Sequence, residues 1–94
     1  MHPRDAEGFE WDDGNIDHLY QPHHPISEYE AEDVFYNGPV WVPVRRKRGR
    51  WKMIGYTDGG RALTILVDVQ VQTRQLRAFT GWECTQSERT RYLS

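Results

Sequence analysis

The sequence of 94 residues contains little of what disulfide-stapled or membrane-anchored proteins need. It has a single cysteine, Cys84, so no disulfide can form within the chain, and packing alone must hold a fold that suits a reducing cytoplasm. No apolar run approaches the length of a membrane span, and residues 1–8 are polar and acidic, unlike a signal peptide. We therefore expect one cytoplasmic domain over residues 9–94, preceded by a flexible tail over residues 1–8.

Basic residues are almost absent from the first 44 positions. Residues 1–44 contain one Arg and ten Asp or Glu, a formal charge of −9, whereas residues 45–94 contain eleven Arg or Lys and four Asp or Glu, a formal +7. Lys47 and Lys52 are the only lysines, and the planar fork of the arginines fits phosphate. The basic part indicates a polyanionic partner, most simply nucleic acid. The alternative is a solvated strand surface neutralised by the acidic part.

The local patterns predict helices followed by strands. Asp12 is placed to cap a helix over residues 13–20, and a capping box at residues 27–30 opens a second helix. Strands are expected over residues 40–44, 51–56, 62–70 and 76–80, with 9–11 as a short strand or an anchoring segment. A capping box at residues 85–88 opens a short helix to about Tyr92. This order predicts an α+β fold with two N-terminal helices packed on an antiparallel four-stranded sheet, and a short C-terminal helix.

Two residues predict where strands lie within this sheet. Pro43 cannot donate a backbone hydrogen bond, so it favours an edge strand or a bulge for residues 40–44. Leu66 lies on the opposite side of its strand from Leu63, Ile65 and Val67, so the strand over residues 62–70 is expected to be central and half-covered on its second side.

A series of short motifs runs along residues 9–92. It comprises Phe9-Glu10-Trp11-Asp12, His24-Pro25-Ile26-Ser27, Ile54-Gly55, Arg77-Ala78-Phe79-Thr80, and a closing T-x-x-E-R-x-x-Y from Thr85 to Tyr92. In this order and spacing the chain resembles the BrnT family of type II toxins, which are small bacterial ribonucleases with a RelE-like fold. Two positions depart from the family pattern. Trp82 stands where members usually have arginine, and His23 stands where they usually have lysine or arginine.

The resemblance implies an endoribonuclease that attacks RNA with the substrate's own 2′-hydroxyl and needs no metal or cofactor. It also implies a cognate ribbon-helix-helix antitoxin as partner, with DNA contacted only through that antitoxin. Such chemistry needs cations beside the scissile phosphate and groups that move two protons. On this basis we predict five catalytic candidates, namely Arg77, Arg61, Lys52, Glu88 and His24.

Each catalytic candidate has a structural alternative. Arg77 alternates with apolar neighbours, so it is expected to project from the sheet face opposite the core, or else to be a plain exposed strand residue. Arg61 follows a hairpin turn and can be an ordinary solvated turn residue, and Lys52 can be an ordinary surface lysine. The capping box already explains Glu88. His24 reaches the active face or only ends the loop after the first helix.

The densest basic cluster predicts contact with the RNA backbone. It contains Arg45, Arg46, Lys47, Arg48 and Arg50, and Trp82 is a candidate for stacking on a base beside it. The alternatives are a solvated hairpin tip and a tryptophan in the core. A metal site built from His18, His23 and His24 is weak, because no cysteine or spaced carboxylate motif accompanies it. The alternative function is a non-catalytic RNA- or protein-binding module on the same fold, which the loss of the arginine at Trp82 favours.

Overall fold

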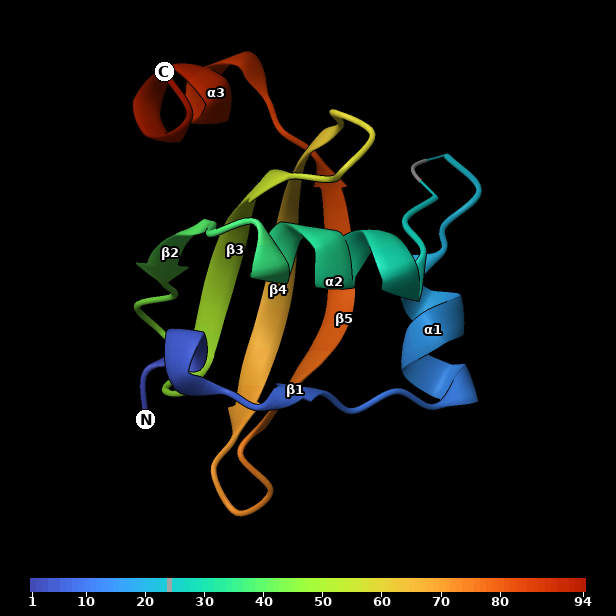
Figure 1. The fold of residues 1–94 in the computed structure, drawn as a ribbon, viewed down its shortest axis with the longest axis vertical. Coiled ribbons are helices and arrows are strands. Elements are labelled where there is room, and N and C mark those ends of the chain that lie inside the picture. Colours follow the sequence, from blue (N-terminus) through green and yellow to red (C-terminus); the bar gives the residue numbers. More distant parts are fainter. Residues whose placement is uncertain (24) are drawn as a thin grey trace.

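The computed structural model describes residues 1–23 and 25–94 and has an α+β fold. A 3-10 helix, η1 (Pro3–Asp5), precedes strand β1 (Gly8–Phe9) and helices α1 (Asp13–Leu19) and α2 (Glu28–Tyr36). Strands β2 (Val40–Pro43), β3 (Arg50–Tyr56), β4 (Ala62–Gln70) and β5 (Gln75–Glu83) follow, and helix α3 (Gln86–Tyr92) comes last (Figure 1). The order of helices and strands agrees with the prediction. Within residues 1–23 and 25–94, no helix has the length and apolarity to span a membrane.

The sheet has five strands in the order β1-β5-β4-β3-β2, rather than the four antiparallel strands predicted. Strands β2 to β5 form an antiparallel meander, and β1 adds a parallel strand beside β5. The main-chain N–H of Glu10 donates to the Leu76 carbonyl at 2.9 Å. Such a parallel pair joins residues almost seventy positions apart, so the local pattern could not reveal it. The predicted edge and central strands, β2 and β4, occupy those positions.

The first eight residues pack against the sheet instead of forming the expected flexible tail. Pro3 is fully buried, and the His2 ring lies 4.7 Å from the ring of Trp51 between their centroids. The N–H of Glu7 donates to the carbonyl of Arg74 at 2.8 Å. The polar composition of this segment gave no sign of these contacts, because their partners lie in β3 and in the turn before β5.

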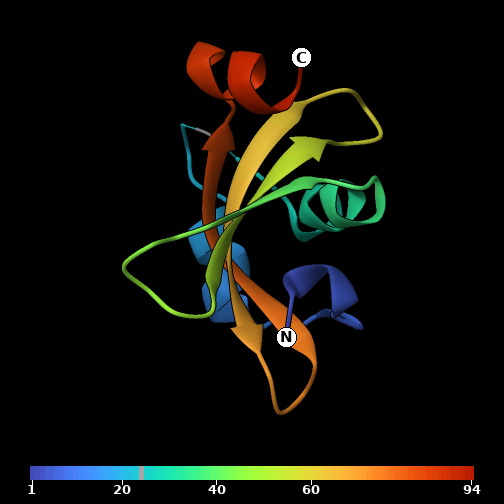
Figure 2. The same ribbon diagram turned by 90° about the vertical axis from the view of Figure 1, so that its left-hand side faces the viewer.

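The main core lies between α2 and one side of the sheet. Figures 1 and 2 show α2 crossing this side, while α1 lies beside β5. The buried side chains of this core are Leu19, Ile26, Ala31, Val34, Met53, Leu63, Ile65, Val67, Leu76 and Ala78. A second, smaller cluster joins Ile54, Ala62 and Cys84 to Tyr92 and Leu93, so α3 covers one end of the opposite side.

The helix starts follow the predicted chemistry. The side chains of Asp12, Ser27 and Thr85 each accept a hydrogen bond from the backbone three residues later, and all three form capping boxes. Helix α2 ends before Gly38, which has a φ of +73° that suits glycine. These local interactions fix where α1, α2 and α3 begin. Their packing against the sheet then decides which side chains remain outside the core.

Candidate nucleic-acid interface

The side of the sheet opposite α2 carries most of the predicted site residues. Because strand side chains alternate and Met53, Ile65 and Ala78 point into the core, their strand neighbours face the other way. The pairing of β3, β4 and β5 aligns these residues in rows across the sheet. Arg50, Asp68 and Arg77 form one row, and Lys52, Leu66 and Thr80 form the next. We call this half-exposed set the open face: Arg50, Lys52, Leu66, Asp68, Arg77, Phe79, Thr80 and Trp82. As the alternation predicts, Arg77 lies on the side away from the core.

Arg50 is held flat on the open face. Its Nε and a terminal nitrogen donate to the two carboxylate oxygens of Asp68 at 2.8 and 3.0 Å. The hydrogen bonds to Asp68 raise the pKa of Arg50 above its ordinary value. The guanidinium carbon lies 4.1 Å above the centre of the Phe79 ring. Phe79 falls within the irregular part of the β4–β5 pairing, and the sequence analysis did not single it out. A strand bulge has no clear sequence signal, so only the strand pairing in the structure shows that the Phe79 ring lies under Arg50.

Arg77 is held between two carboxylates that precede α1. One terminal nitrogen lies 2.7 Å from Asp12 Oδ2, and the other donates to Glu10 Oε1 at 3.4 Å. The pKa of Asp12 lies below its ordinary value, first because the Asn15 N–H donates to it and then because Arg77 does. Arg77 is therefore on the predicted face, but its charge is largely balanced in the free protein.

Lys52 is the least neutralised cation of the open face. Lys52 pairs with Leu66 across β3 and β4. Along β3 it lies between Arg50, which is bound to Asp68, and Ile54, which belongs to the smaller apolar cluster under α3. Among the described residues, no carboxylate lies within 4.0 Å of its ammonium group. An ammonium group with no protein counter-ion is free to neutralise a bound phosphate.

Trp82 and Glu88 contact each other at the end of β5. The indole Nε1–H of Trp82 donates to the two Glu88 oxygens at 3.0 and 3.3 Å. Partial burial alone would raise the pKa of Glu88, but hydrogen bonds from the Thr85 N–H, Trp82 and Thr64 hold it below its ordinary value. A carboxylate stabilised in this way is a weak proton acceptor, which disfavours Glu88 as a general base. Trp82 is half-exposed rather than buried in the core.

Arg61 is not brought together with Arg77. It extends to the α2 side of the molecule, where its guanidinium donates to Glu30 at 2.7 Å, to Glu83 at 3.1 Å and to the Pro25 carbonyl at 3.0 Å. The hydrogen bond to Glu30 is the main reason that the pKa of Arg61 is raised. The prediction of a catalytic Arg61 therefore conflicts with its position, because this side chain joins α2 to the sheet. The sequence did not indicate these carboxylates, which lie 31 and 22 residues away.

The basic loop (residues 45–48) lies in the connection from β2 to β3, and all four of its residues are exposed. Figure 2 shows this connection projecting from the sheet on the side opposite α2, which is the side of the open face. Its backbone is folded as a turn, with the Arg50 N–H donating to the Lys47 carbonyl at 3.1 Å. The four basic residues predicted to contact RNA thus flank the open face. The prediction for His24 lies outside the described residues.

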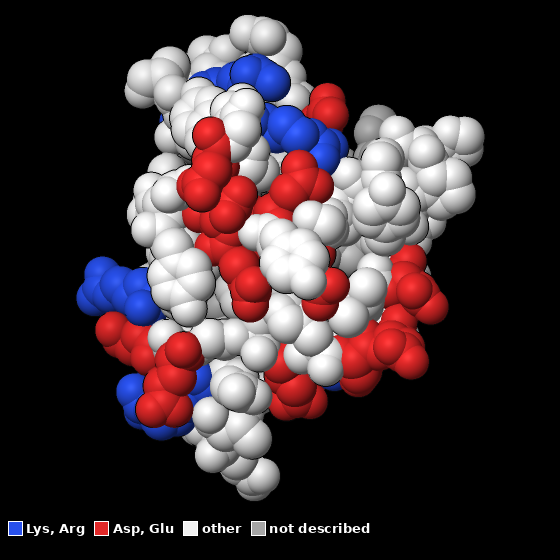
Figure 3. Space-filling model, turned by 45° about the vertical axis from the view of Figure 1, so that its right-hand side comes forward, with Lys and Arg blue, Asp and Glu red and all other residues white. Residues whose placement is uncertain are grey.

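Acidic side chains gather on the other side of the molecule. Figure 3 shows Asp and Glu concentrated over α1 and α2. The separation of charge along the sequence is therefore partly a separation in space: the basic loop and α2 lie on opposite sides of the sheet, whereas Glu10 and Asp12, before α1, meet Arg77 of the open face. Among the described residues, no three His, Cys, Asp or Glu side chains lie together as metal ligands. Burial raises the pKa of the Cys84 thiol, which makes it a poor nucleophile.

No family model, no curated protein and no solved structure matches this chain.

Proposed function

We propose that the protein binds RNA through the open face and the basic loop, and that it is the endoribonuclease toxin of a type II toxin–antitoxin pair. The observation that carries this proposal is that Lys52 shares one side of the sheet with two aromatic residues of β5, Phe79 and Trp82, and that four exposed basic residues flank this side. Cations bind the phosphate backbone and aromatic rings stack on bases, and both occur here together. The order of two helices, a meander and a last helix supports a RelE-like arrangement, with β1 as an addition.

The proposed reaction uses the 2′-hydroxyl of the substrate. Its oxygen forms a bond to the adjacent phosphorus and loses its proton to solvent water, while the bond to the 5′-oxygen breaks and that oxygen takes up a proton from water. Two negative charges develop on the phosphorane, so cations held in place beforehand are the main requirement. In this proposal Lys52 neutralises the scissile phosphate. Arg77, oriented by Asp12 and Glu10, directs its remaining N–H donors toward the same phosphate.

The proposed partner is a ribbon-helix-helix antitoxin, which would contact DNA on behalf of the pair. This part of the proposal is supported by the family resemblance of the motifs between Phe9 and Tyr92. An adjacent gene for a ribbon-helix-helix protein, whose product copurifies with this chain and stops RNA cleavage, is the expected result. Failure of such a product to bind would leave RNA binding intact but remove the toxin–antitoxin assignment.

A second candidate function is RNA binding without cleavage. Three observations favour it: Arg77 is balanced by two carboxylates, Arg61 lies on the opposite side, and the family arginine is replaced by Trp82. A tryptophan stacks on bases but cannot neutralise a phosphorane. Trp82→Arg is the discriminating variant. It should raise cleavage if the rest of the site is competent, whereas a large loss of thermal stability without any gain in cleavage would assign Trp82 to packing rather than to the active site.

The decisive experiment measures binding and cleavage of an end-labelled single-stranded RNA, with and without EDTA. We expect cleavage in EDTA, and a decrease of about 10²-fold in Lys52→Ala and in Arg77→Ala. Thermal stability should be unchanged in Lys52→Ala and modestly lower in Arg77→Ala, which loses its two ion pairs. Arg74→Gln is the matched control, because it removes one positive charge from the β4–β5 turn. Binding without cleavage would assign the second function. Absence of binding by the wild-type protein would overturn both.

A further inference from the structure

The outer side of α2 carries two exposed tyrosines with carboxylates between them. Tyr29 and Tyr36 are 71% and 69% exposed, more than any other large hydrophobic side chain in the described residues. They stand seven positions apart in the helix, with Glu32 and Asp33 between them, so all four share one side. We call these four residues the tyrosine stripe. Two large rings left in water on one helix side are characteristic of a contact surface.

The two carboxylates of the tyrosine stripe are already positioned. One oxygen of Glu32 accepts from the Trp11 indole N–H at 3.3 Å, and one oxygen of Asp33 accepts from the Asp58 N–H at 3.2 Å. Each bond uses a single carboxylate oxygen. The second oxygen of each carboxylate accepts no hydrogen bond within the described residues, so it is available to a donor on a ligand.

The surroundings of the stripe are acidic. Helix α2 has two acidic residues in its first turn and no basic residue in its last, and Figure 3 shows few blue side chains beside the red ones over α1 and α2. This charge repels a polyanion such as RNA and attracts a cation. Tyrosine rings attract cations too, through the negative faces of their π-systems.

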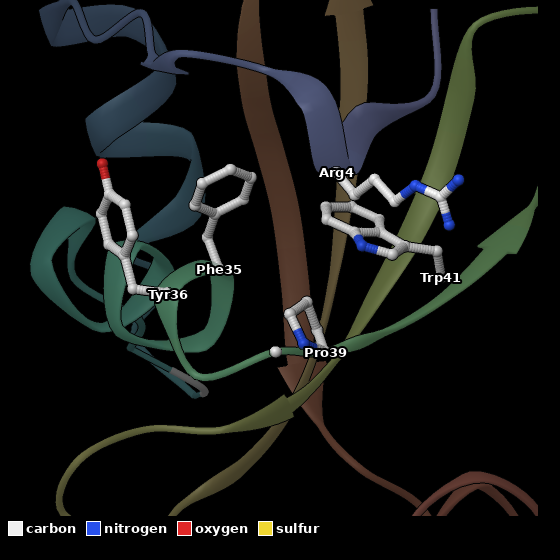
Figure 4. A pocket seen from close by; sticks show the side chains of 6 residues that line it. Arg4, Phe35, Tyr36, Pro39 and Trp41 are labelled. Atoms are coloured by element: carbon white, nitrogen blue, oxygen red, sulfur yellow. The ribbon is translucent and has the colours of Figure 1, made fainter.

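A pocket continues the stripe at the end of α2. It has a volume of about 450 Å³ and is lined by Arg4, Phe35, Tyr36, Gly38, Pro39 and Trp41. Figure 4 shows Phe35 and Tyr36 on one side of it and Trp41 with Arg4 on the other, with Pro39 between them. Its aromatic walls suit an apolar side chain. Tyr36 belongs both to the pocket and to the stripe, so one bound segment can contact both.

We propose that the tyrosine stripe and this pocket form a docking surface for an arginine-rich segment of a protein partner, with arginines on the stripe and an apolar residue in the pocket. Arginine fits better than lysine, because its guanidinium stacks on a ring while its edge donates to a carboxylate. A second copy of this chain fits poorly. Its basic loop projects from the side opposite α2 (Figure 2), so such a contact would run head to tail and could not form a closed two-fold dimer. This inference does not rest on the proposed RNA chemistry.

The test compares two fluorescent peptides, each with four arginines or four lysines separated by single alanines, by anisotropy on the purified protein. We expect the arginine peptide to bind more tightly, and Tyr29→Ser/Tyr36→Ser to weaken it about tenfold and remove the difference between the peptides. This double variant does not change the net charge and alters only exposed side chains. Tyr56→Ser is the matched control, because Tyr56 is an exposed tyrosine on the other side of the sheet.

Three outcomes would overturn the proposal. The first is equal affinity of the wild-type protein for both peptides. The second is a loss of affinity in Tyr56→Ser as large as in the double variant. The third is concentration-dependent self-association in sedimentation that the double variant abolishes, because the occupant would then be a second copy. Retention of RNA binding by the double variant would separate this surface from the open face.

Discussion

Replacing Arg61 tests whether this residue stabilises the fold or contacts a substrate. Arg61→Ala removes two ion pairs and one hydrogen bond to the Pro25 carbonyl. The Arg61 side chain is 31% exposed, so solvent screens the pairs, and we count each at roughly 0.5–1 kcal/mol. With about 1 kcal/mol for the hydrogen bond, the free energy of unfolding falls by roughly 2–3 kcal/mol. For a domain of this size the Tm then falls by about 10–20 °C.

The assay is thermal and urea unfolding followed by circular dichroism, with RNA binding measured well below the lowered Tm. Arg61→Lys is the matched control, because it keeps the charge and loses the fork that reaches Glu30 and Glu83 together, so an intermediate Tm is expected. RNA binding should stay within about twofold of wild type in both variants. An unchanged Tm combined with lost RNA binding or cleavage would refute the structural role and restore Arg61 as a substrate contact.

Three further predictions concern the loop, the sheet and pH. Replacing Arg46, Lys47 and Arg48 together by glutamine should reduce the slope of log K for RNA against log salt by about 2, and an unchanged slope would place the loop outside the site. Gly81→Ala should lower the unfolding free energy by roughly 1–3 kcal/mol in urea titrations, because its Cβ would lie 2.9 Å from the Thr64 carbonyl oxygen; a neutral result would contradict this packing. Although partial burial raises the pKa of Glu30, hydrogen bonds from Arg61 and Ser27 leave it below the ordinary 4.5, so its contribution to stability is present above that pH and disappears as the pH falls further. The difference in unfolding free energy between wild type and Arg61→Ala should therefore be full above about pH 4.5 and shrink as the pH falls below it, and a difference that does not change with pH would count against the pair.

The separation of charge has a consequence for how the molecule meets its partners. The basic loop and the acidic helix α2 lie on opposite sides of one small sheet, so the two ligands proposed above would not compete for the same surface. Since α3 covers only the end of the open face, through Tyr92 and Leu93, most of that face stays accessible. The two proposed surfaces can thus be disabled separately, by Lys52→Ala on one side and by the tyrosine double variant on the other.

The amino-acid sequence by itself determined the elements and the direction of their side chains. Capping at Asp12, Ser27 and Thr85 fixed where the helices begin, since a cap satisfies backbone donors within the same few residues. Strand alternation placed Arg77 away from the core, and the pattern around Leu66 gave a central strand. These predictions depend only on neighbours along the chain.

Only the tertiary structure decided which charges meet. Arg77 is balanced by Glu10 and Asp12, and Arg61 pairs with Glu30, because the fold brings together residues 31 to 67 positions apart. The parallel pairing of β1 and the burial of Pro3 have the same origin. Local propensity contains no information about such distant partners. It therefore identified the arginines as candidates, whereas packing determined that Lys52 is the open-face cation with no carboxylate partner among the described residues.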